Sequence, residues 1–387
     1  MPAKTVAPVY EPESGAEPGQ SVDELDTPAL LVDLDRMERN IGRWQAAVSA
    51  AGPRFRVHVK THKVPEIARL QLAAGACGIA CAKVSEAEVF AAAGCEDIVV
   101  AYPVVGPEKW RRLARLAESG IAVGAGCESE AAARGMSEVV AAHGVEVGVH
   151  VEIDTGLHRC GFEPSRYDEI DAFCRLVERL PGLRLEGITT YRGLGFDGAS
   201  AMTREEAGHE EGRIVAELAQ RLRTDGHEIR EVTAGGTPTG LAVAEVPGIS
   251  EVRAGVYVFN DLMQVGSGSA ELDDQALTAL CTVVSHSSRD RATVDGGSKT
   301  FSGDQGVVGP AGGVEIARAV DADIAIERLT EEHGMARVGS TDVEIGQKLR
   351  FYPTHACTAV NLSDQLIGVR ADRVETVWPV LARGKRT

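Results

Sequence analysis

A regular alternation of short strand-like runs and longer helical segments constrains the fold of this chain more than any other feature. Segments rich in Ala, Leu, Glu and Arg with helical spacing, such as 108–119 and 205–224, separate the apolar runs. The strand-like runs lie at 56–60, 78–82, 97–101, 121–124, 147–153, 185–190, 230–234 and 250–254. Eight strands with interleaved helices over roughly 200–230 residues predict a (β/α)8 barrel of the TIM type. A doubly wound open sheet, the competing fold, would more often carry a Gly-rich turn after its first strand.

The sequence pattern changes after about residue 256. Helical segments become scarce, and short β-rich runs separated by Gly and Asp take their place. We therefore predict a barrel domain over residues 26–256 and an all-β C-terminal domain over residues 257–387, with the first barrel residues as candidates for joining the β domain. Residues 1–25 are rich in Pro, Glu, Gly and Ser and have few large apolar side chains, which predicts a flexible tail.

The amino-acid composition indicates which kinds of partner and which cellular setting are excluded for this chain. The chain has 387 residues, of which 44% are hydrophobic, and a net charge of −17. Such acidity argues against nucleic acid or an anionic membrane as a partner, because both need a basic face. No apolar run approaches the roughly 18 residues of a membrane span, and the first residues do not resemble a signal peptide. The eight cysteines form no CxxC pair, which predicts reduced, mostly buried thiols in a cytoplasmic protein.

The run Arg56-Val57-His58-Val59-Lys60-Thr61-His62-Lys63 places a lysine at the end of the first predicted strand. Active sites of such barrels lie at the carboxyl ends of the strands, so Lys60 is expected in the mouth of the barrel. Partial burial and a neighbouring cation, here Lys63, lower the pKa of a lysine and make its amine a nucleophile. Such an amine can hold an aldehyde cofactor as a Schiff base. A solvated surface cluster is the structural alternative.

Two glycine turns follow the seventh and eighth predicted strands, where barrels of this type often bind phosphate. The first is Gly235-Gly236-Thr237, and the second is Arg253-Ala254-Gly255-Val256-Tyr257. Glycines let backbone N–H groups approach an anion closely, and the threonine hydroxyl adds a donor. After the fifth strand, Asp154 and Arg159 flank a tight turn. Arg159 either contacts an anionic oxygen of a cofactor or forms a surface ion pair beside a self-contained turn.

In the predicted β domain, His355 and Cys357 lie two residues apart. Residues i and i+2 of a strand share a face, so an imidazole and a thiolate could bind one metal ion. Two protein ligands would leave coordination positions open for water and substrate.

Together and in this order, these segments resemble the fold-type III pyridoxal phosphate (PLP) enzymes, specifically the D-threonine aldolase and D-serine dehydratase family, relatives of alanine racemase. The resemblance runs from Asp26 through the His355–Cys357 segment. It implies that Lys60 carries PLP, that Arg159 contacts the ring oxygen and that Tyr191, after the sixth strand, lies beside the ring. It implies that Gly236, Thr237, Gly255 and Val256 bind the phosphate. Arg253 matches a racemase position that faces the pyridine nitrogen.

The same resemblance implies that His355 and Cys357 hold a divalent ion over the β-hydroxyl of a D-amino acid. Zinc is favoured by the thiolate, with manganese and magnesium as alternatives. Relatives often have Pro where Val57 stands and Asn or Gly where Thr354 stands, and neither position carries a reacting atom. The resemblance also implies a homodimer.

Two lyase reactions remain open, because both need the same ion in the same place. Dehydration of a β-hydroxy D-amino acid gives a 2-oxo acid and ammonia, and retro-aldol cleavage gives glycine and an aldehyde. The H-x-C spacing favours dehydration, since the better-known aldolases of the family have H-x-D. A racemase would leave the metal without a role, and a PLP carrier of the barrel type would lack the β domain.

Overall fold

The computed structural model describes residues 15–193, 202–304, 306–310 and 312–387. The chain divides into two compact units. One unit comprises Arg36–Gln275 and Val380–Thr387 and contains the barrel; the other comprises the described residues up to Asp35 and Ala276–Pro379. The expected flexible tail falls partly on residues 1–14, which lie outside the described residues.

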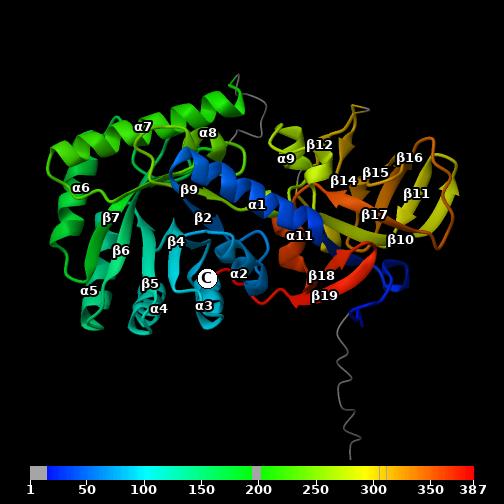
Figure 1. Ribbon diagram of the computed structural model, residues 1–387, viewed down its shortest axis with the longest axis horizontal. Helices are drawn as coiled ribbons and strands as arrows, with labels where there is room; N and C mark the ends of the chain where they lie inside the picture. Colours follow the sequence, from blue (N-terminus) through cyan, green and yellow to red (C-terminus); the bar gives the residue numbers. More distant parts are fainter. Residues whose placement is uncertain (1–14, 194–201, 305, 311) are drawn as a thin grey trace, which may run out of the picture. The chain divides into compact units, whose positions relative to one another are not determined.

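Eight parallel strands close into a barrel in the order β2 to β9, as predicted (Figure 1). The strands are β2 Arg54–His58, β3 Gly78–Cys81, β4 Asp97–Pro103, β5 Ala122–Cys127, β6 Val147–Ile153, β7 Leu183–Thr190, β8 Glu231–Ala234 and β9 Glu251–Ala254. Pairing of β2 with β9 closes the cylinder, with Arg54 opposite Glu251 and Val57 opposite Ala254. The side chains of β3 and β6 are buried on both faces of the sheet, which explains the mostly apolar sequences of these strands.

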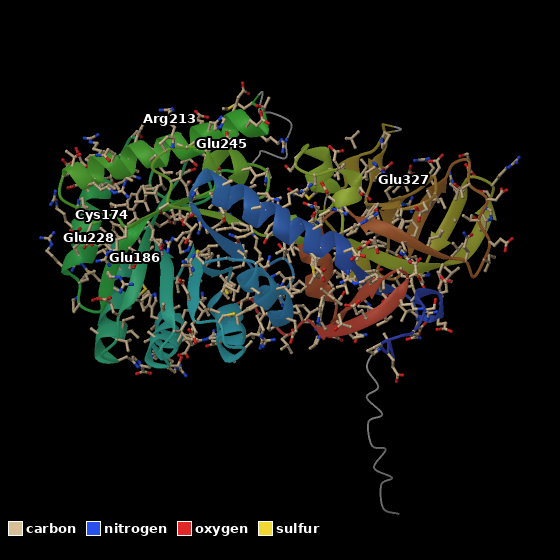
Figure 2. The ribbon with its side chains drawn as sticks, viewed as in Figure 1. Cys174, Glu186, Arg213, Glu228, Glu245 and Glu327 are labelled. Atoms are coloured by element: carbon tan, nitrogen blue, oxygen red, sulfur yellow. The ribbon has the colours of Figure 1, made fainter. Side chains whose placement is uncertain are left out.

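Helices alternate with the barrel strands along the chain (Figure 1), and the longer ones bury an apolar stripe. They are α1 Leu34–Ala51, α2 Pro65–Ala73, α3 Val84–Ala92, α4 Pro107–Glu118, α5 Glu130–Ala142, α6 Tyr167–Arg179, α7 Arg204–Thr224, α8 Gly240–Ala244 and α9 Leu262–Gly266. On α4 the stripe is Trp110, Leu113 and Leu116, while on α7 the exposed side carries charges such as Arg213 (Figure 2). Within the described part of the chain, no helix is long and apolar enough to cross a membrane.

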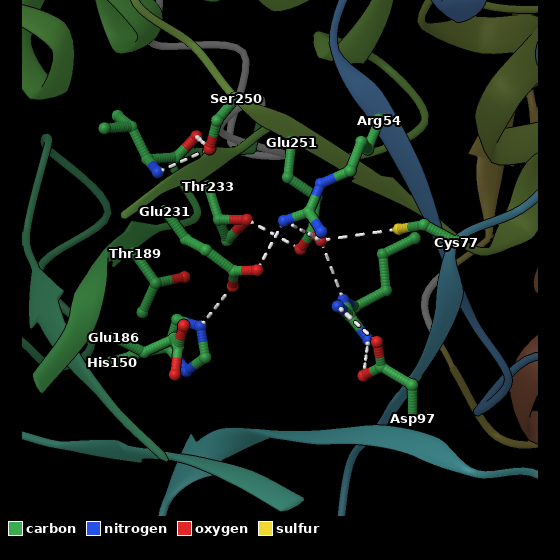
Figure 3. Close-up of polar contacts among 12 residues, drawn as sticks. Arg54, Cys77, Asp97, His150, Glu186, Thr189, Glu231, Thr233, Ser250 and Glu251 are labelled. Atoms are coloured by element: carbon green, nitrogen blue, oxygen red, sulfur yellow. Dashed lines mark hydrogen bonds and ion pairs between the residues drawn. The ribbon is translucent and has the colours of Figure 1, made fainter. Parts of the chain in front are cut away.

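The amino ends of the barrel strands hold a buried network of charges (Figure 3). Arg56, 2% exposed, donates to Glu251 at 2.9 Å and to Asp97 at 2.6 Å. Glu231 accepts from Arg54 and, at 2.7 Å, from Nε2 of His150. Each buried charge has a partner, as its desolvation requires. This network lies at the end of the barrel where residues serve stability rather than catalysis.

The other unit is built on a nine-stranded, mostly antiparallel sheet in the order β11-β16-β15-β14-β17-β10-β1-β18-β19. Its strands are β1 Ala29–Asp33, β10 Leu277–Ser288, β11 Arg291–Val294, β14 Ala317–Ala319, β15 Ile324–Leu329, β16 Gly334–Val338, β17 Lys348–Pro353, β18 Gln365–Arg370 and β19 Arg373–Pro379. A two-stranded sheet, β12 Val307–Val308 with β13 Val314–Glu315, and the helices α10 Ser298–Phe301 and α11 Ala356–Leu362 complete it. β1 pairs with β10 and β18.

The division of the chain differs from the predicted boundary at residue 256. Residues 257–275 stay with the barrel unit, because Asn40 of α1 donates to the carbonyl oxygen of Asp274 at 2.7 Å and Arg36 pairs with Asp273 at 2.8 Å. These residues form short turns and helices whose sequence lacks a periodic pattern, so the pattern change at 256 preceded the structural boundary.

Both ends of the chain also pack more closely than expected. Val22 and Leu25 are each 1% exposed and join a small core of the β unit, so the tail prediction is wrong for residues near 22–25. At the other end, Val380–Thr387 return to the barrel unit, where the N–H of Ser85 donates to the carbonyl oxygen of Thr387 at 2.7 Å. Each of these end segments has only two or three buried apolar side chains, which is too few to give a periodic pattern in the sequence.

The eight cysteines form no disulfide bond, as predicted.

Candidate active site

Lys60 lies in the turn that follows β2, at the carboxyl end of the barrel. The strand ends at His58, two residues earlier than predicted, although the N–H of Val59 still donates to Ala80 at 2.9 Å. The Lys60 N–H donates to Nδ1 of His58 at 3.4 Å. Burial, followed by the charges of Lys60 and Arg253, lowers the pKa of His58 well below its ordinary value. The imidazole beside Lys60 is therefore neutral near pH 7.

Lys63 does not act as the free neighbouring cation that the sequence suggested. Its Nζ donates to Oε1 of Glu86 on α3 at 2.8 Å, and both side chains are buried. A carboxylate at this distance compensates most of the ammonium charge felt by other groups. The basic run is consequently neither a solvated surface cluster nor a pair of cooperating lysines, because Lys60 is only partly exposed and Lys63 belongs to the protein interior.

A chain of buried hydrogen bonds connects the turn after β2 to the glycine turns. Nδ1 of His62 accepts from the N–H of Val64 at 3.1 Å, so Nε2 carries the proton and donates to Gln71 at 3.1 Å. Gln71 donates to the hydroxyl of Tyr257 at 2.8 Å. Burial lowers the pKa of His62 to about 3, which keeps this ring neutral. The N–H of Tyr257 in turn donates to the Thr237 hydroxyl at 3.1 Å.

The two glycine turns have the properties of an anion cradle. Among the described residues, the backbone N–H groups of Gly236, Thr237 and Val256 donate to no protein acceptor. A Cβ placed on Gly236 would lie 2.6 Å from Cε2 of Tyr191, and one on Gly255 would lie 2.7 Å from the carbonyl oxygen of His58. Only glycine lets the backbone come this close to its neighbours. These free donors and close approaches fit the phosphate of PLP.

The structure brings Arg159 and Tyr191 together from the ends of β6 and β7. The Arg159 guanidinium carbon lies 5.2 Å from the centroid of the Tyr191 ring, and its Nη2 lies 3.9 Å from Glu152. Asp154 instead stabilises its own turn, accepting from the N–H groups of Gly156 at 2.9 Å and His158 at 3.0 Å. Burial raises the pKa of Asp154, but these hydrogen bonds outweigh it and lower the net value.

Arg253 is buried and committed to the end of β7. Its Nη2 donates to the hydroxyl of Thr189 and to the carbonyl oxygen of Thr190, the latter at 3.1 Å. Burial lowers the pKa of Arg253, opposed by the nearby carboxylate of Glu152 and other acidic groups. The Arg253 side chain thus fixes the carboxyl end of β7, which Tyr191 directly follows.

Sequence reasoning missed Glu211, a fully buried carboxylate of α7. Its Oε1 accepts from the N–H of Arg192 and the N–H of Gly235, both at 3.1 Å, and its Oε2 accepts from the hydroxyl of Thr239 at 2.9 Å. Burial raises the pKa of Glu211, against these hydrogen bonds. One carboxylate therefore joins the loops after β7 and β8. The available signal was a charged residue on the otherwise small and apolar buried stripe of α7.

In the β unit, His355 and Cys357 do not lie on a strand, so the argument from strand periodicity is wrong. β17 ends at Pro353, His355 is the N-cap of α11 and Cys357 lies in its first turn. Nδ1 of His355 hydrogen-bonds Oδ2 of Asp304 at 2.6 Å. In the described residues, no group of three or more His, Cys, Asp and Glu side chains forms a metal site. A ring held through Nδ1 fits a metal ligand, because the lone pair then lies on Nε2.

Comparisons with known proteins agree with this arrangement. A model of the alanine racemase N-terminal domain matches residues 32–262, and a model of a putative serine dehydratase domain matches residues 276–369. A D-threonine aldolase from Arthrobacter sp is 34% identical over 95% of this chain and 96% of its own length. D-threo-3-hydroxyaspartate dehydratase from Delftia sp. HT23 is 35% identical over 86% of this chain and 91% of its own length.

The solved structure of the Delftia dehydratase superimposes with a TM-score of 0.85 and 32% identity, covering 93% of this chain and 98% of that chain. Two further structures of the dehydratase carry a histidine-to-alanine substitution and, two positions later, a cysteine-to-alanine substitution, the second in a metal-free form. Similarity of this extent covers both units of the present chain. The chain therefore belongs to the fold-type III PLP enzymes, in the family of D-threonine aldolase and D-serine dehydratase.

Proposed function

We propose that this protein is a PLP- and divalent-metal-dependent lyase that acts on D-β-hydroxy-α-amino acids and dehydrates them to a 2-oxo acid and ammonia. The observation that carries the substrate class is similarity over nearly the whole chain to relatives named for D-threonine, 3-hydroxy-D-aspartate and D-serine. Each of these amino acids has a hydroxyl group on its β-carbon.

The barrel mouth offers a distinct group for each part of PLP. In this proposal the Lys60 amine would hold the aldehyde of PLP covalently, Arg159 would bind the ring oxygen and Tyr191 would pack beside the ring. The free N–H groups of Gly236, Thr237 and Val256, with the close backbone approach at Gly255, support phosphate binding in the glycine turns. Arg253 holds the strand end behind them. PLP supplies an electron sink for bonds at the substrate α-carbon.

The residues of the chain then supply proton transfer and electrophilic assistance. The Lys60 amine, once free of the cofactor, would accept the α-proton of the substrate. His355 and Cys357 would hold a divalent ion, and its Lewis acidity would help the β-hydroxyl leave as hydroxide, which takes up that proton to become water. The released enamine tautomerises and takes up water, so that the net products are one 2-oxo acid and one ammonium ion.

The choice of dehydration over retro-aldol cleavage rests on the metal ligands. A histidine and a cysteine two positions apart are the residues substituted in the structures of the Delftia dehydratase, and this chain has the same pair at the same spacing in His355 and Cys357. A thiolate ligand favours zinc over manganese or magnesium. Retro-aldol cleavage to glycine and an aldehyde is the second candidate, because the Arthrobacter aldolase is similar to the same extent.

A substrate panel tests the proposal. The purified enzyme, with PLP and zinc, is incubated with D-threonine, D-serine and D-threo-3-hydroxyaspartate. Release of 2-oxobutyrate, pyruvate or oxaloacetate supports dehydration, whereas glycine with an aldehyde identifies an aldolase and an L-amino acid identifies a racemase. EDTA should abolish lyase activity and leave the visible absorbance of bound PLP unchanged.

Lys60→Ala tests the cofactor assignment separately. We expect the variant to lose the PLP that borohydride fixes to the parent protein, as measured by the mass of the peptide containing position 60. Retention of the label in the variant would contradict the role of Lys60.

A homodimer and a cytoplasmic location remain predictions. Sedimentation at micromolar concentration measures the mass of the particle and so checks the homodimer.

A further inference from the structure

Asp304 is held against His355 by a compact set of hydrogen bonds within the β unit. The Asp304 Oδ2 atom lies 2.6 Å from Nδ1 of His355 and 2.7 Å from the hydroxyl oxygen of Thr358, which donates to it. The N–H of Asp304 donates to the hydroxyl of Ser302 at 3.2 Å. Thr358 lies three residues after His355 at the start of α11, so the same helix turn presents both donors to one carboxylate oxygen.

This contact determines which ring nitrogen His355 can offer to a metal. An ionised carboxylate only accepts hydrogen bonds, so the proton of the neutral imidazole must lie on Nδ1. The lone pair is then on Nε2, and the carboxylate raises the basicity of that nitrogen. A neutral imidazole without the carboxylate would distribute its proton between the two nitrogens and rotate more freely.

We propose that Asp304 is the positioning residue of the metal site: it fixes the tautomer and ring orientation of His355, and Thr358 holds the carboxylate in place. The inference rests on the proposed function, since it concerns the same metal ion. It adds a residue 51 positions away in the sequence to the pair that the H-x-C motif provides. A carboxylate near the first turn of α11 could instead serve only to stabilise that helix, so the experiment must separate metal affinity from folding.

The experiment measures zinc affinity by chelator competition on the PLP-loaded protein without substrate. The variants are Asp304→Ala, Asp304→Asn and Thr358→Val, with His355→Ala and Cys357→Ala as references. We expect Asp304→Ala to bind zinc about 10- to 100-fold more weakly. Asp304→Asn keeps an acceptor oxygen without the charge and should fall between that variant and the parent, as should Thr358→Val.

Three outcomes overturn the inference, in different ways. Unchanged zinc affinity in a folded Asp304→Ala, with binding lost in the two reference variants, refutes the role of Asp304 and leaves the metal site intact. Unchanged affinity in the reference variants refutes the proposed site itself. Loss of binding in Asp304→Ala as complete as in His355→Ala, with an altered visible spectrum of the cobalt-substituted Asp304→Asn, makes Asp304 a direct ligand. Melting temperatures of the metal-free variants and the result for Thr358→Val guard against a folding defect.

Discussion

Replacement of Glu211 separates the hydrogen-bonding role of this buried carboxylate from its charge. Both backbone donors, the N–H groups of Arg192 and Gly235, bind Oε1, whereas the Thr239 hydroxyl binds Oε2. A glutamine can keep its carbonyl oxygen at the first position. Its NH2 group then takes the second position and donates to the hydroxyl of Thr239, which reverses its own direction. Alanine offers no acceptor to any of the three groups.

The two substitutions should therefore differ strongly in free energy of unfolding. Each buried donor left without a partner costs about 1–3 kcal/mol, so Glu211→Ala loses about 3–9 kcal/mol before relief of the buried charge is counted. Because removing a buried charge returns several kcal/mol, we expect a net loss of about 3 kcal/mol. Glu211→Gln makes all three hydrogen bonds and buries no charge, so its stability should stay within about 1 kcal/mol of the parent.

Thermal unfolding and hydrogen exchange measure this difference. For a unit of this size, about 3 kcal/mol corresponds to a fall in melting temperature of roughly 6–12 °C. In Glu211→Ala, exchange should accelerate at the amides of Arg192 and Gly235, and the affinity for PLP should fall because Gly235 begins the glycine turn. An alanine variant as stable as the parent, with unchanged exchange at the amides of Arg192 and Gly235, would refute the hydrogen-bond argument. A glutamine variant as unstable as the alanine variant would show that the charge is required.

Three further changes test individual contacts. Gly236→Ala places a Cβ 2.6 Å from the Tyr191 ring, so PLP affinity in fluorescence titration should fall at least about tenfold. Because the folded pKa of His62 is about 3 and its unfolded pKa about 6.5, the unfolded chain binds the extra proton between these values, and stability falls as pH drops through this window. His62→Gln should reduce the fall in melting temperature between pH 7 and pH 5. Lys63→Met leaves Glu86 buried without its partner and should cost about 3–5 kcal/mol, much of which Glu86→Gln in the same chain should restore in a double-mutant cycle.

Matched controls are available for each of these changes. Gly42→Ala on α1 meets no atom within 4 Å and should leave PLP binding unchanged. His209, half exposed beside Glu245, should tolerate replacement by glutamine without measurable loss of stability. The exposed pair Lys299–Glu332 should tolerate Lys299→Met without measurable loss of stability. A tenfold loss of PLP affinity in Gly42→Ala would contradict the steric explanation for Gly236→Ala. A loss of stability in Lys299→Met equal to that in Lys63→Met would contradict the claim that burial makes the Lys63–Glu86 pair important.

The barrel could be predicted from the sequence alone, because each of its strands has a recognisable local sequence pattern. Each of the eight runs is four to seven residues long and contains at least one β-branched residue, and the helices between them repeat apolar residues every three or four positions. All eight predicted runs overlap observed strands, from β2 to β9. The short motifs, in their order, likewise carried the resemblance to the family. A lysine and glycines that follow strands of one parallel barrel must lie at the same end of it.

The tertiary structure alone decided which charges face one another. Lys63 and Lys60 are neighbours in the sequence, yet Lys63 pairs with Glu86 on helix α3. Asp304 reaches His355 across 51 residues, and Glu211 joins two loops from a helix that precedes one of them. Periodicity reports which face of an element is buried, but the partner of a buried polar group depends on which elements pack together. That choice is made by the whole fold, because a buried charge is stable only where another element supplies its hydrogen bonds.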